Sequence, residues 1–353
     1  MTAPAGVTAA TDRSGSLLQL DDLCVQLPVE GEPRPVLRGI SLQLAAGEAV
    51  GLVGESGSGK SMTARAVARI LPPGAAVTGS ISFDGRDVSA LRGAALKQYR
   101  GEVVMIFQDP RAHINPVRTI GDFMTEVLRT NQGVRSGPAA AQAAALLEEV
   151  GISDGERRLR QYPHELSGGM LQRVMIASAL LTEPRLILAD EPTTALDVTT
   201  QAEVMAILDQ LRRDRDLALL FITHDLELAG AVCDRTAVMY AGQLVETQAS
   251  SDLHDHPKHP YTAALVSARP RIESTATRLA AIPGRPLSAF EAPDGCGFAP
   301  RCRFVEDRCR RTEPELRPLG PALVRCVRAD QLDLAADLTA DLTADLTAPV
   351  HDD

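Results

Sequence analysis

The chain has no apolar run long enough to cross a membrane. Its longest apolar stretches, such as LALLFI at 217–222, have the length of a strand, whereas a membrane-spanning helix needs about 20 consecutive apolar residues. The first 16 residues also lack the charged start and apolar block of a secretory signal. We therefore expect a cytoplasmic protein, in a compartment where structural disulfides are rare.

Lysine is scarce as well, and acidic residues outnumber basic ones by 46 to 36. The formal net charge is −10, and there is no basic stripe of the kind that binds nucleic acid. Only three of the 36 basic residues are lysines, namely Lys60, Lys97 and Lys258. A chain that uses Arg almost everywhere is expected to need a compact ammonium group where it does use Lys. The composition thus argues against nucleic acid as a partner and draws attention to the three lysines.

Apolar strand-sized segments alternate with helical patterns through the first 250 residues. The strand candidates include 103–107, 185–190 and 217–223, and helical patterns cover 138–150 and 169–182. This alternation predicts an α/β domain with a mainly parallel sheet. After residue 250 proline becomes frequent and the periodicity fades.

Four segments follow from this organisation. The repeat ADLT near the end indicates a solvated, disordered tail rather than a helix with a weak leucine stripe. We predict a disordered N-terminal tail (1–16), an α/β nucleotide-binding domain (17–250), a C-terminal region (251–332) and an acidic low-complexity tail (333–353).

The segment GESGSGKS at 54–61 matches the phosphate-binding pattern G-x-x-x-x-G-K-[ST] at every fixed position. Its glycines let backbone N–H groups turn toward phosphate oxygens, and the helix that follows adds the positive end of its dipole. Lys60 is expected to reach the β- and γ-phosphates, and Ser61 to coordinate Mg²⁺. The apolar strand before the segment, the helical pattern after it and the rare lysine argue against a chance glycine turn. The predicted nucleotide contacts in this loop are Gly54, Glu55, Ser56, Gly57, Ser58, Gly59, Lys60, Ser61 and Met62.

Two carboxylates, Asp190 and Glu191, follow the apolar strand LILA. Carboxylates at a buried strand end are costly unless they meet a cation or a proton. Asp190 suits a role in holding Mg²⁺, directly or through water. Glu191 then suits polarisation of the attacking water, a general-base contribution of roughly 10²–10⁴-fold. Together with the phosphate loop, these residues predict NTP hydrolysis, although kinases, GTPases and motors share that much.

A second candidate anion site opens a helix in LSGGMLQR, where Ser167, Gly168 and Gly169 stand at the start. One nucleotide needs only one such cradle, so a second one indicates a composite site. At this point the chain resembles the ATP-binding cassette (ABC) family. In that family two cassettes face head to tail, and the signature of one subunit closes over the ATP held by the phosphate loop of the other.

The resemblance implies an ABC-type P-loop fold, with a mainly parallel core sheet, an antiparallel β subdomain, a helical signature subdomain and here a small irregular C-terminal region. Gln108 in IFQDP is similar to the Q-loop glutamine, Asp197 in TALD to the D-loop aspartate, and His224 in FITHD to the switch histidine. Taken alone, Gln108 could be a surface residue and His224 a core residue, but the order of the motifs favours the family roles. The expected catalytic residues are Glu191, His224, Gln108 and Lys60. The expected Mg²⁺ ligands are Ser61, Gln108 and Asp190.

Both Asp190 and His224 follow apolar strands, so we expect them at the same sheet edge. One position departs from the family pattern. Many cassettes carry an aromatic residue in the early strand that stacks on adenine, and the corresponding position here is Leu27. Base–aromatic stacking of about 1–3 kcal/mol would then be lost. Nucleotide affinity and the preference for adenine over guanine are therefore less firmly predicted than the phosphate chemistry.

Transport, DNA repair and translation are the three settings in which an ABC cassette works. Repair cassettes insert long coiled coils before the signature, whereas here only 58 positions separate Gln108 from Leu166. The translation type carries two cassettes per chain. Transport remains, and four segments resemble the ATPase subunits of bacterial dipeptide and oligopeptide importers across roughly 17–328. These segments are DPRAHINPVRTIGD, HPYTAAL, IPGRPLS and GCGFAPRC.

The importer resemblance implies several partners. They are two membrane permeases, which dock on segment 109–125, a second homologous ATPase and, indirectly, an extracytoplasmic solute-binding protein. A heterodimer of ATPases is expected and a homodimer is the alternative. The location implied is the cytoplasmic face of the membrane. Related importers carry nickel chelates or glutathione, and no residue here separates those cargoes. A regulatory cassette outside transport is the alternative class.

Four of the six cysteines crowd into the C-terminal region, at Cys296, Cys302, Cys309 and Cys326. Their spacing lacks the short C-x₂₋₄-C knuckles usual in zinc sites, and unligated cysteines, zinc and an iron–sulfur cluster all remain open on spacing alone. Five arginines lie close in sequence, and nearby cations lower thiol pKa values. Some importer ATPases bear a [4Fe–4S] cluster in this region. The resemblance therefore favours a cluster on these four cysteines, with Zn²⁺ second.

Overall fold

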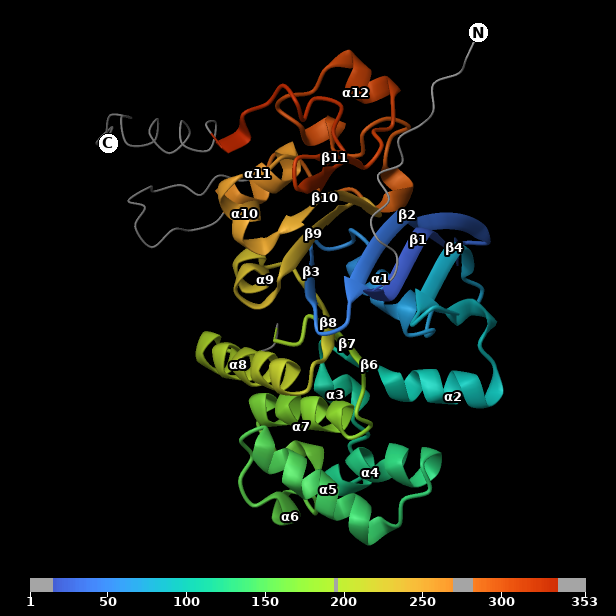
Figure 1. Cartoon of the computed structure of the whole chain (residues 1–353), viewed down its shortest axis with the longest axis vertical. Helices are drawn as coiled ribbons and strands as arrows, with labels where there is room; N and C mark the ends of the chain where they lie inside the picture. Colours follow the sequence, from blue (N-terminus) through green and yellow to red (C-terminus); the bar gives the residue numbers. More distant parts are fainter. Residues whose placement is uncertain (1–14, 194–195, 269–281, 336–353) are drawn as a thin grey trace, which may run out of the picture.

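The computed structural model describes residues 15–193, 196–268 and 282–335. The predicted N-terminal tail, apart from its last two residues, and the acidic tail beyond residue 335 lie outside these ranges, so their disorder stays a prediction. Within the described residues, two β-sheets stand beside a helical lobe (Figure 1). This arrangement confirms the α/β fold class.

The smaller sheet is antiparallel, in the order β2-β1-β4-β5. Apolar residues recur along its strands, and Leu18, Leu20, Ile40, Leu42 and Leu44 all turn their side chains into the core because successive strand residues point to opposite faces. The bounds of its strands are β1 (Ser16–Val29), β2 (Glu32–Ala45), β4 (Ala76–Phe83) and β5 (Arg86–Asp87).

The larger sheet has the order β11-β12-β10-β9-β3-β8-β7-β6. The five strands from β9 to β6 run parallel. The strands β3, β7 and β8 are buried along their whole length, as expected for a parallel sheet that helices cover on both faces. The strand bounds are β3 (Ala49–Val53), β6 (Val103–Ile106), β7 (Leu186–Asp190), β8 (Ala218–Thr223), β9 (Arg235–Tyr240), β10 (Gln243–Ala249), β11 (Arg317–Leu319) and β12 (Ala322–Val324).

Helices α4 to α7 form the lobe at the bottom of Figure 1, where α5 packs against α4, α6 and α7. Within the described ranges, none of the helices combines the length and the apolar character that a membrane crossing requires. The helix bounds are α1 (Lys60–Val67), α2 (Gly93–Glu102), α3 (Pro110–His113), α4 (Ile120–Asn131), α5 (Ser136–Glu149), α6 (Gly155–Arg158), α7 (Gly168–Leu180), α8 (Val198–Asp214), α9 (Leu226–Val232), α10 (Ser250–Asp255), α11 (Pro260–Ser267) and α12 (Asp307–Arg311).

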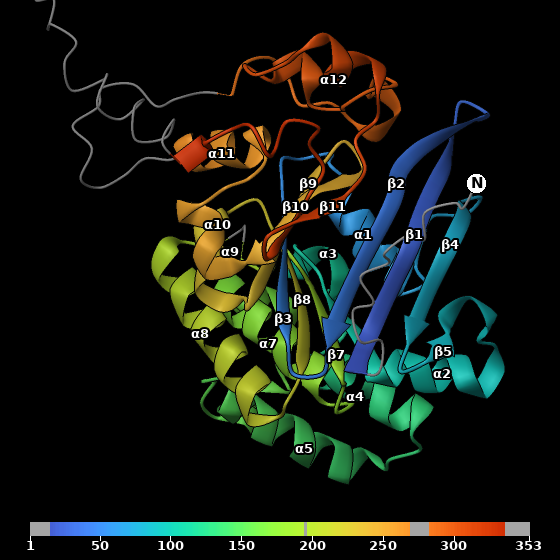
Figure 2. The same cartoon turned by 45° about the horizontal axis from the view of Figure 1, so that its top comes forward.

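The C-terminal region lies on the larger sheet rather than apart from it (Figure 2). Its strand β12 pairs with β10, and β11 pairs with β12, so the region extends the cassette's own sheet. Its aromatic residue Phe298 packs against Tyr240 and Tyr261, with ring centroids 5.3 and 5.2 Å apart. The predicted boundary near residue 250 falls between β10 and α10, and one shared core continues across it.

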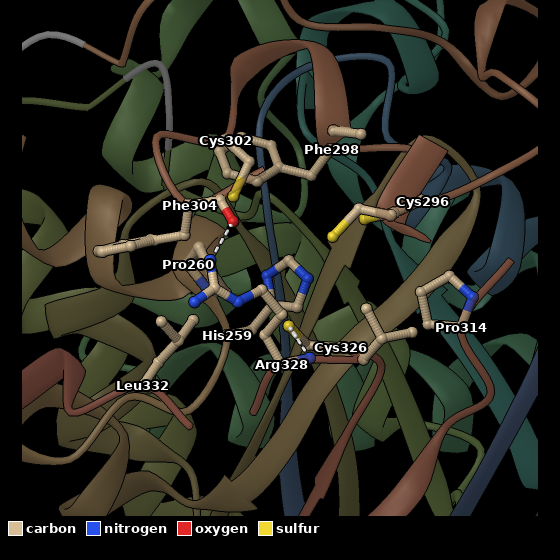
Figure 3. A pocket seen from close by; sticks show the side chains of 13 residues that line it. His259, Pro260, Cys296, Phe298, Cys302, Phe304, Pro314, Cys326, Arg328 and Leu332 are labelled. Carbon is tan, nitrogen blue, oxygen red and sulfur yellow. Dashed lines mark hydrogen bonds between the residues drawn. The ribbon is translucent and has the colours of Figure 1, made fainter. Parts of the chain in front are cut away.

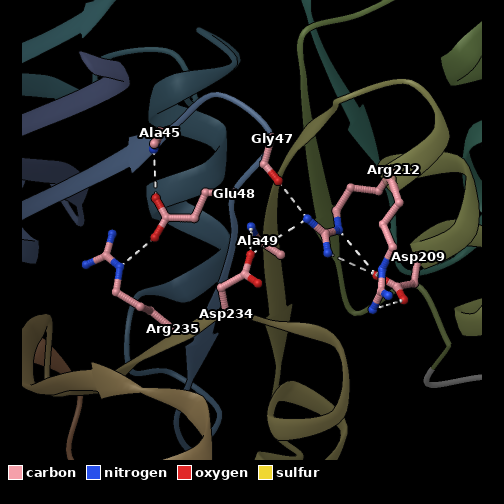
Figure 4. A network of polar contacts seen from close by, with 9 residues as sticks. Ala45, Gly47, Glu48, Ala49, Asp209, Arg212, Asp234 and Arg235 are labelled. Carbon is pink, nitrogen blue, oxygen red and sulfur yellow. Dashed lines mark hydrogen bonds and ion pairs between the residues drawn. The ribbon is translucent and has the colours of Figure 1, made fainter. Parts of the chain in front are cut away.

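A polar network fixes the start of β3, the strand that leads into the phosphate loop (Figure 4). Ala49 N donates to Asp234 Oδ2 at 2.8 Å, and Arg212 of α8 donates to Gly47 O at 2.6 Å. Glu48 accepts from Arg235 Nε at 2.6 Å. These bonds connect the residues before β3 to α8 and to the start of β9. The beginning of β3 is therefore held in place, and the phosphate loop follows at its other end.

Candidate active site

The phosphate loop turns at the end of β3 and runs directly into α1. Gly59 has φ +108°, and a Cβ added there would meet Leu37 Cδ2 at 2.8 Å and Val36 O at 3.0 Å. A Cβ at Gly54 would meet Met239 O at 2.2 Å. Only glycine suits both positions, the first because of its backbone conformation and the second because the neighbouring backbone is so close. The two glycines thus shape a turn in which backbone N–H groups can face phosphate oxygens.

Lys60 begins α1 and folds back over the loop. Its Nζ donates to Gly54 O at 2.8 Å and to Glu55 O at 3.0 Å. Burial lowers the pKa of the ammonium, while the nearby carboxylates of Glu191, Asp190 and Glu55 raise it. The net effect lowers the pKa of Lys60, and this residue, only 5% exposed, lies where nucleotide phosphates are expected.

The next residue, Ser61, reaches the end of β7. Its Oγ donates to Asp190 Oδ1 at 2.7 Å. Burial raises the pKa of Asp190, and the bond from Ser61 opposes that shift. This hydroxyl–carboxylate pair matches the oxygen ligands that Mg²⁺ takes beside a nucleotide. The structure thus brings two of the three predicted Mg²⁺ ligands into contact.

Glu191 contacts two of the other predicted catalytic residues, Gln108 and His224. Gln108 Nε2 donates to Glu191 Oε2 at 3.2 Å, and His224 Nδ1 lies 3.4 Å from the same oxygen. Glu191 also has φ +45°, in the left-handed region that non-glycine residues rarely adopt. The strands β3, β8, β7 and β6 are neighbours in that order. Lys60, His224, Glu191 and Gln108 therefore lie at one sheet edge. This is the edge that Asp190 and His224 were expected to share.

The signature residues lie elsewhere. Ser167 caps α7, where its Oγ accepts from Met170 N at 3.3 Å. The cleft above the phosphate loop is not lined by Ser167, Gly168 or Gly169. Asp197 caps α8 and accepts from Thr200 N at 3.0 Å. Hydrogen bonds from Thr200 lower the pKa of Asp197. Within one chain, then, the two predicted anion cradles stay apart.

A cleft of about 840 Å³ opens above the phosphate loop. The predicted residues that line it include Lys60, Ser61, Gln108, Glu191 and His224. The sequence analysis missed other lining residues, because most of them belong to the C-terminal region and carry no phosphate-binding pattern. These are Leu265, Pro286, Ser288, Ala289 and Phe290, with Val36 from β2.

A buried ion pair joins the C-terminal region to the phosphate loop. The side chain of Arg301 is 4% exposed and donates to Glu55 Oε2 at 2.6 Å and to Glu55 Oε1 at 3.1 Å. Arg301 Nε also donates to Pro283 O at 2.8 Å. Tyr261 Oη accepts from the backbone N–H of Glu55 at 2.9 Å. Sequence alone gave no signal for this contact, because 246 positions separate Glu55 from Arg301.

The four cysteines of the C-terminal region line one cavity together with His259. Figure 3 shows Cys296, Cys302 and Cys326 around the same space as the His259 ring. The cavity is narrow, with a volume of about 20 Å³. In the part of the chain that the structure describes, no three His, Cys, Asp or Glu side chains gather as ligands of a single metal ion.

The expected effect of the arginines on the thiols is wrong. Burial raises the pKa of Cys296 to about 12 and that of Cys302 to about 11. Two of the arginines point elsewhere: Arg301 pairs with Glu55, and the Arg303 guanidinium lies 4.8 Å from the centroid of the Phe304 ring. At Cys296 and Cys302 burial therefore outweighs the cations, and a metal would have to take the protons of these thiols.

The fold and this sheet edge define a P-loop ATPase of the ABC class. Residues 37–194 match the family model of ABC transporters, and residues 245–309 match that of the oligopeptide/dipeptide transporter C-terminal region. The oligopeptide transport ATP-binding protein OppD of Salmonella typhimurium is 40% identical over 90% of this chain and 95% of its own length. The dipeptide transport ATP-binding protein DppD of Haemophilus influenzae is 42% identical, over 88% and 95%. The chain belongs to this family of transport ATP-binding proteins, which confirms the family predicted from the sequence.

Solved structures agree on the fold. The dimeric, post-hydrolysis structure of the ATP-binding cassette MJ0796 with ADP and phosphate covers 66% of this chain and 98% of that chain, at 27% identity and a TM-score of 0.59. A cassette from Clostridium perfringens, cbiO1, covers 68% of this chain and 91% of that one, at 24% identity and a TM-score of 0.58. Proteins of this class bind ATP with Mg²⁺ and hydrolyse the ATP.

Proposed function

We propose that the chain is the ATP-hydrolysing subunit of an importer for dipeptides or oligopeptides. The observation that carries this proposal is the union, in one chain, of a complete ATPase edge with a C-terminal region of the oligopeptide/dipeptide transporter type. Relatives named for oligopeptide and dipeptide transport support the same cargo class. Nickel chelates and glutathione are the alternative cargoes. The complete set Lys60, Asp190, Glu191 and His224 argues against a regulatory cassette without catalysis.

In this proposal the loop 54–61 binds the phosphates of ATP, with Lys60 on the β- and γ-phosphates. Ser61 and Asp190 hold Mg²⁺, with Gln108 as a further ligand. Glu191 takes the proton of the attacking water, and its contacts with Gln108 and His224 hold its carboxylate at the sheet edge. When Mg²⁺ is bound, it offsets charge on the transferred phosphoryl group.

The signature residues act on a second subunit. Ser167, Gly168 and Gly169 begin α7 away from the chain's own cleft, so they are placed for the nucleotide of a partner cassette, with Asp197 beside them at the start of α8. The MJ0796 cassette, solved as a dimer, supports such pairing. We propose a heterodimer with a homologous ATPase, with a homodimer as the alternative.

Two permeases supply the membrane pore, and an extracytoplasmic solute-binding protein delivers the cargo. The segment 109–125 is the proposed permease contact. It runs from Asp109 through α3 into α4, and residues 111–113 and 115–117 are exposed, with Val117 79% exposed. The chain would then sit at the cytoplasmic face of the membrane.

We also propose that Cys296, Cys302, Cys309 and Cys326 hold a [4Fe–4S] cluster. The four thiols line one cavity, and this supports a cluster that takes one thiolate per iron. The narrow cavity means that the thiols must move apart to admit it. Zn²⁺ is the alternative ligand.

Cysteine variants test the cluster. Protein purified without oxygen should absorb visible light broadly and contain about four iron and four sulfide per chain, and Cys302→Ser should lose both. Cys24→Ser, outside the cavity, is the matched control and should keep them. Colourless protein with one zinc or no metal would remove the cluster.

The peptide assignment is tested by transport. The chain, its permeases and its binding protein are reconstituted in vesicles and offered a labelled dipeptide, a nickel chelate or glutathione with ATP. We expect ATP-dependent uptake of the dipeptide that Glu191→Gln abolishes. Uptake of another cargo alone would overturn the peptide assignment and leave the ATPase in place.

A further inference from the structure

An aromatic side chain from the C-terminal region stands in the nucleotide cleft. Phe290 lines the cleft together with the phosphate loop, yet it is 48% exposed. A large apolar side chain that is half open to solvent inside a cleft has unused surface for a ligand. Phosphates cannot use that surface, because they need charges and N–H donors. The part of a nucleotide that can use it is the base.

The position of Phe290 is fixed by its neighbours. It belongs to the short helix η4 (Ala289–Glu291), in which Ser288 Oγ donates to Glu291 Oε2 at 2.6 Å. Ala289 is 4% exposed and packs on Gly242, where an added Cβ would come within 2.7 Å of it. Gly242 N in turn donates to Ser58 O of the phosphate loop at 2.9 Å. The ring therefore stands on the same framework as the loop that holds the phosphates.

One further contact brings the ring to the strand where the sequence lacks an aromatic residue. The Arg34 guanidinium lies over the Phe290 ring, 5.4 Å from its centroid. Arg34 is the cross-strand partner of Leu27 in the β1–β2 pair, and such partners have Cβ atoms about 4.5–5.5 Å apart. Phe290 thus reaches, from the far end of the chain, the neighbourhood of Leu27.

We propose that Phe290, steadied by Arg34, is the surface on which the base of the bound nucleotide stacks. The ring supplies what Leu27 lacks. Because every base has a π-face, stacking holds bases without reading their hydrogen-bonding edges. The site should therefore favour purines, through their larger ring area, and separate adenine from guanine only weakly. This inference requires nucleotide binding by the phosphate loop and is independent of the cargo.

The test compares a nucleotide with its phosphates alone. The full-length chain is titrated calorimetrically, with Mg²⁺, against non-hydrolysable analogues of ATP and GTP and against inorganic tripolyphosphate. Phe290→Ala should weaken the binding of both nucleotide analogues by roughly 5- to 150-fold and leave tripolyphosphate binding unchanged. Phe290→Trp should bind the analogues at least as tightly as the unmodified chain.

Two further variants separate stacking from a general effect on the fold. Leu27→Phe should restore part of the lost affinity when combined with Phe290→Ala. Leu323→Ala, which removes another partly exposed apolar side chain of the C-terminal region, should change nothing. Unchanged binding of the ATP analogue by Phe290→Ala overturns the proposal, and so does an equal loss for the analogue and tripolyphosphate. A chain that bound neither ligand before mutation would instead contradict its assignment as an ATPase.

Discussion

The cassette and the C-terminal region position their functional side chains in different ways. In the cassette, His224, Glu191 and Gln108 each follow a strand of the parallel sheet, so the sheet brings them to one edge. The phosphate loop carries Lys60 from the end of β3 to the same edge. Where the C-terminal region is described, its elements are short, as η4, α12 and β11 illustrate. In that region, buried polar side chains position the functional residues by contacts between segments that are far apart in the sequence.

Arg301 illustrates the second way. It holds the carbonyl oxygen of Pro283 and the carboxylate of Glu55, two segments far apart in the sequence. Sheet hydrogen bonds tolerate many changes of side chain, whereas a contact of this kind depends on one residue. The cassette should therefore lose chemistry when its residues change, and the C-terminal region should lose stability and nucleotide affinity.

The largest expected effect is on hydrolysis. Glu191→Gln removes the proposed base, so ATP turnover should fall roughly 10²–10⁴-fold while nucleotide binding remains. Phosphate release is measured in the assembled transporter, with the partner's own site inactivated. Glu183→Gln is the matched control, because Glu183 is also a glutamate with positive φ but lies exposed outside the cleft. Turnover at the unmodified rate in Glu191→Gln would show that another group takes the proton.

The second effect concerns the ion pair between the two regions. Arg301→Met leaves Glu55 without its partner. Breaking a fully buried pair costs about 3–5 kcal/mol of unfolding free energy, and the loss here should lie near the lower end of that range because the Glu55 side chain is 23% exposed. Because Glu55 is part of the phosphate loop, nucleotide affinity should fall as well. Denaturant unfolding and nucleotide titration measure the two losses.

Arg285→Met provides the comparison for Arg301. Arg285 also pairs with a glutamate, Glu291, at 2.6 Å, but its side chain is 70% exposed. Exposed pairs contribute little to stability, so this variant should stay close to the unmodified chain. Equal, small losses in the two variants would mean that Arg301 does not hold the loop.

The same contrast explains what could be predicted from the sequence. The edge around Glu191 was predictable, because each residue lies in a local motif next to an apolar strand, and parallel strands must align their ends. The position of Phe290 was not, because it depends on Ala289 packing on Gly242 and on Arg34 of β2, contacts that no local pattern encodes. Leu27 marked the gap without indicating which residue fills it.

The prediction of lowered thiol pKa values was wrong for a related reason. Five arginines near the cysteines in sequence suggested lowered pKa values, but the direction of each side chain decides its effect on a neighbour. Arg301 turns to Glu55, and burial then dominates around Cys296 and Cys302. Closeness in sequence was a poor guide where regular structure does not fix the directions of side chains.

The smallest of the three effects is a pH dependence within the shared core. Glu246 of β10 is fully buried and accepts from Lys258 N and His259 N, both at 2.8 Å. Burial raises its pKa to about 7 from 4.5. Between these values the folded chain holds a proton that the unfolded chain has released. The unfolding free energy should therefore fall as the pH rises from about 4.5 to 7, by up to about 1.4 kcal/mol per pH unit.

Glu246→Gln isolates this contribution. The amide cannot titrate, and its NH₂ group faces a backbone donor at a cost that does not change with pH. The difference in unfolding free energy between the unmodified chain and Glu246→Gln should therefore shift in favour of the variant by roughly 3 kcal/mol between pH 4.5 and 7, and level off about one pH unit above 7. Denaturant unfolding at several pH values measures it, with Glu183→Gln as the exposed control. A constant difference across this range would mean that Glu246 stays ionised, with the two backbone donors outweighing its burial.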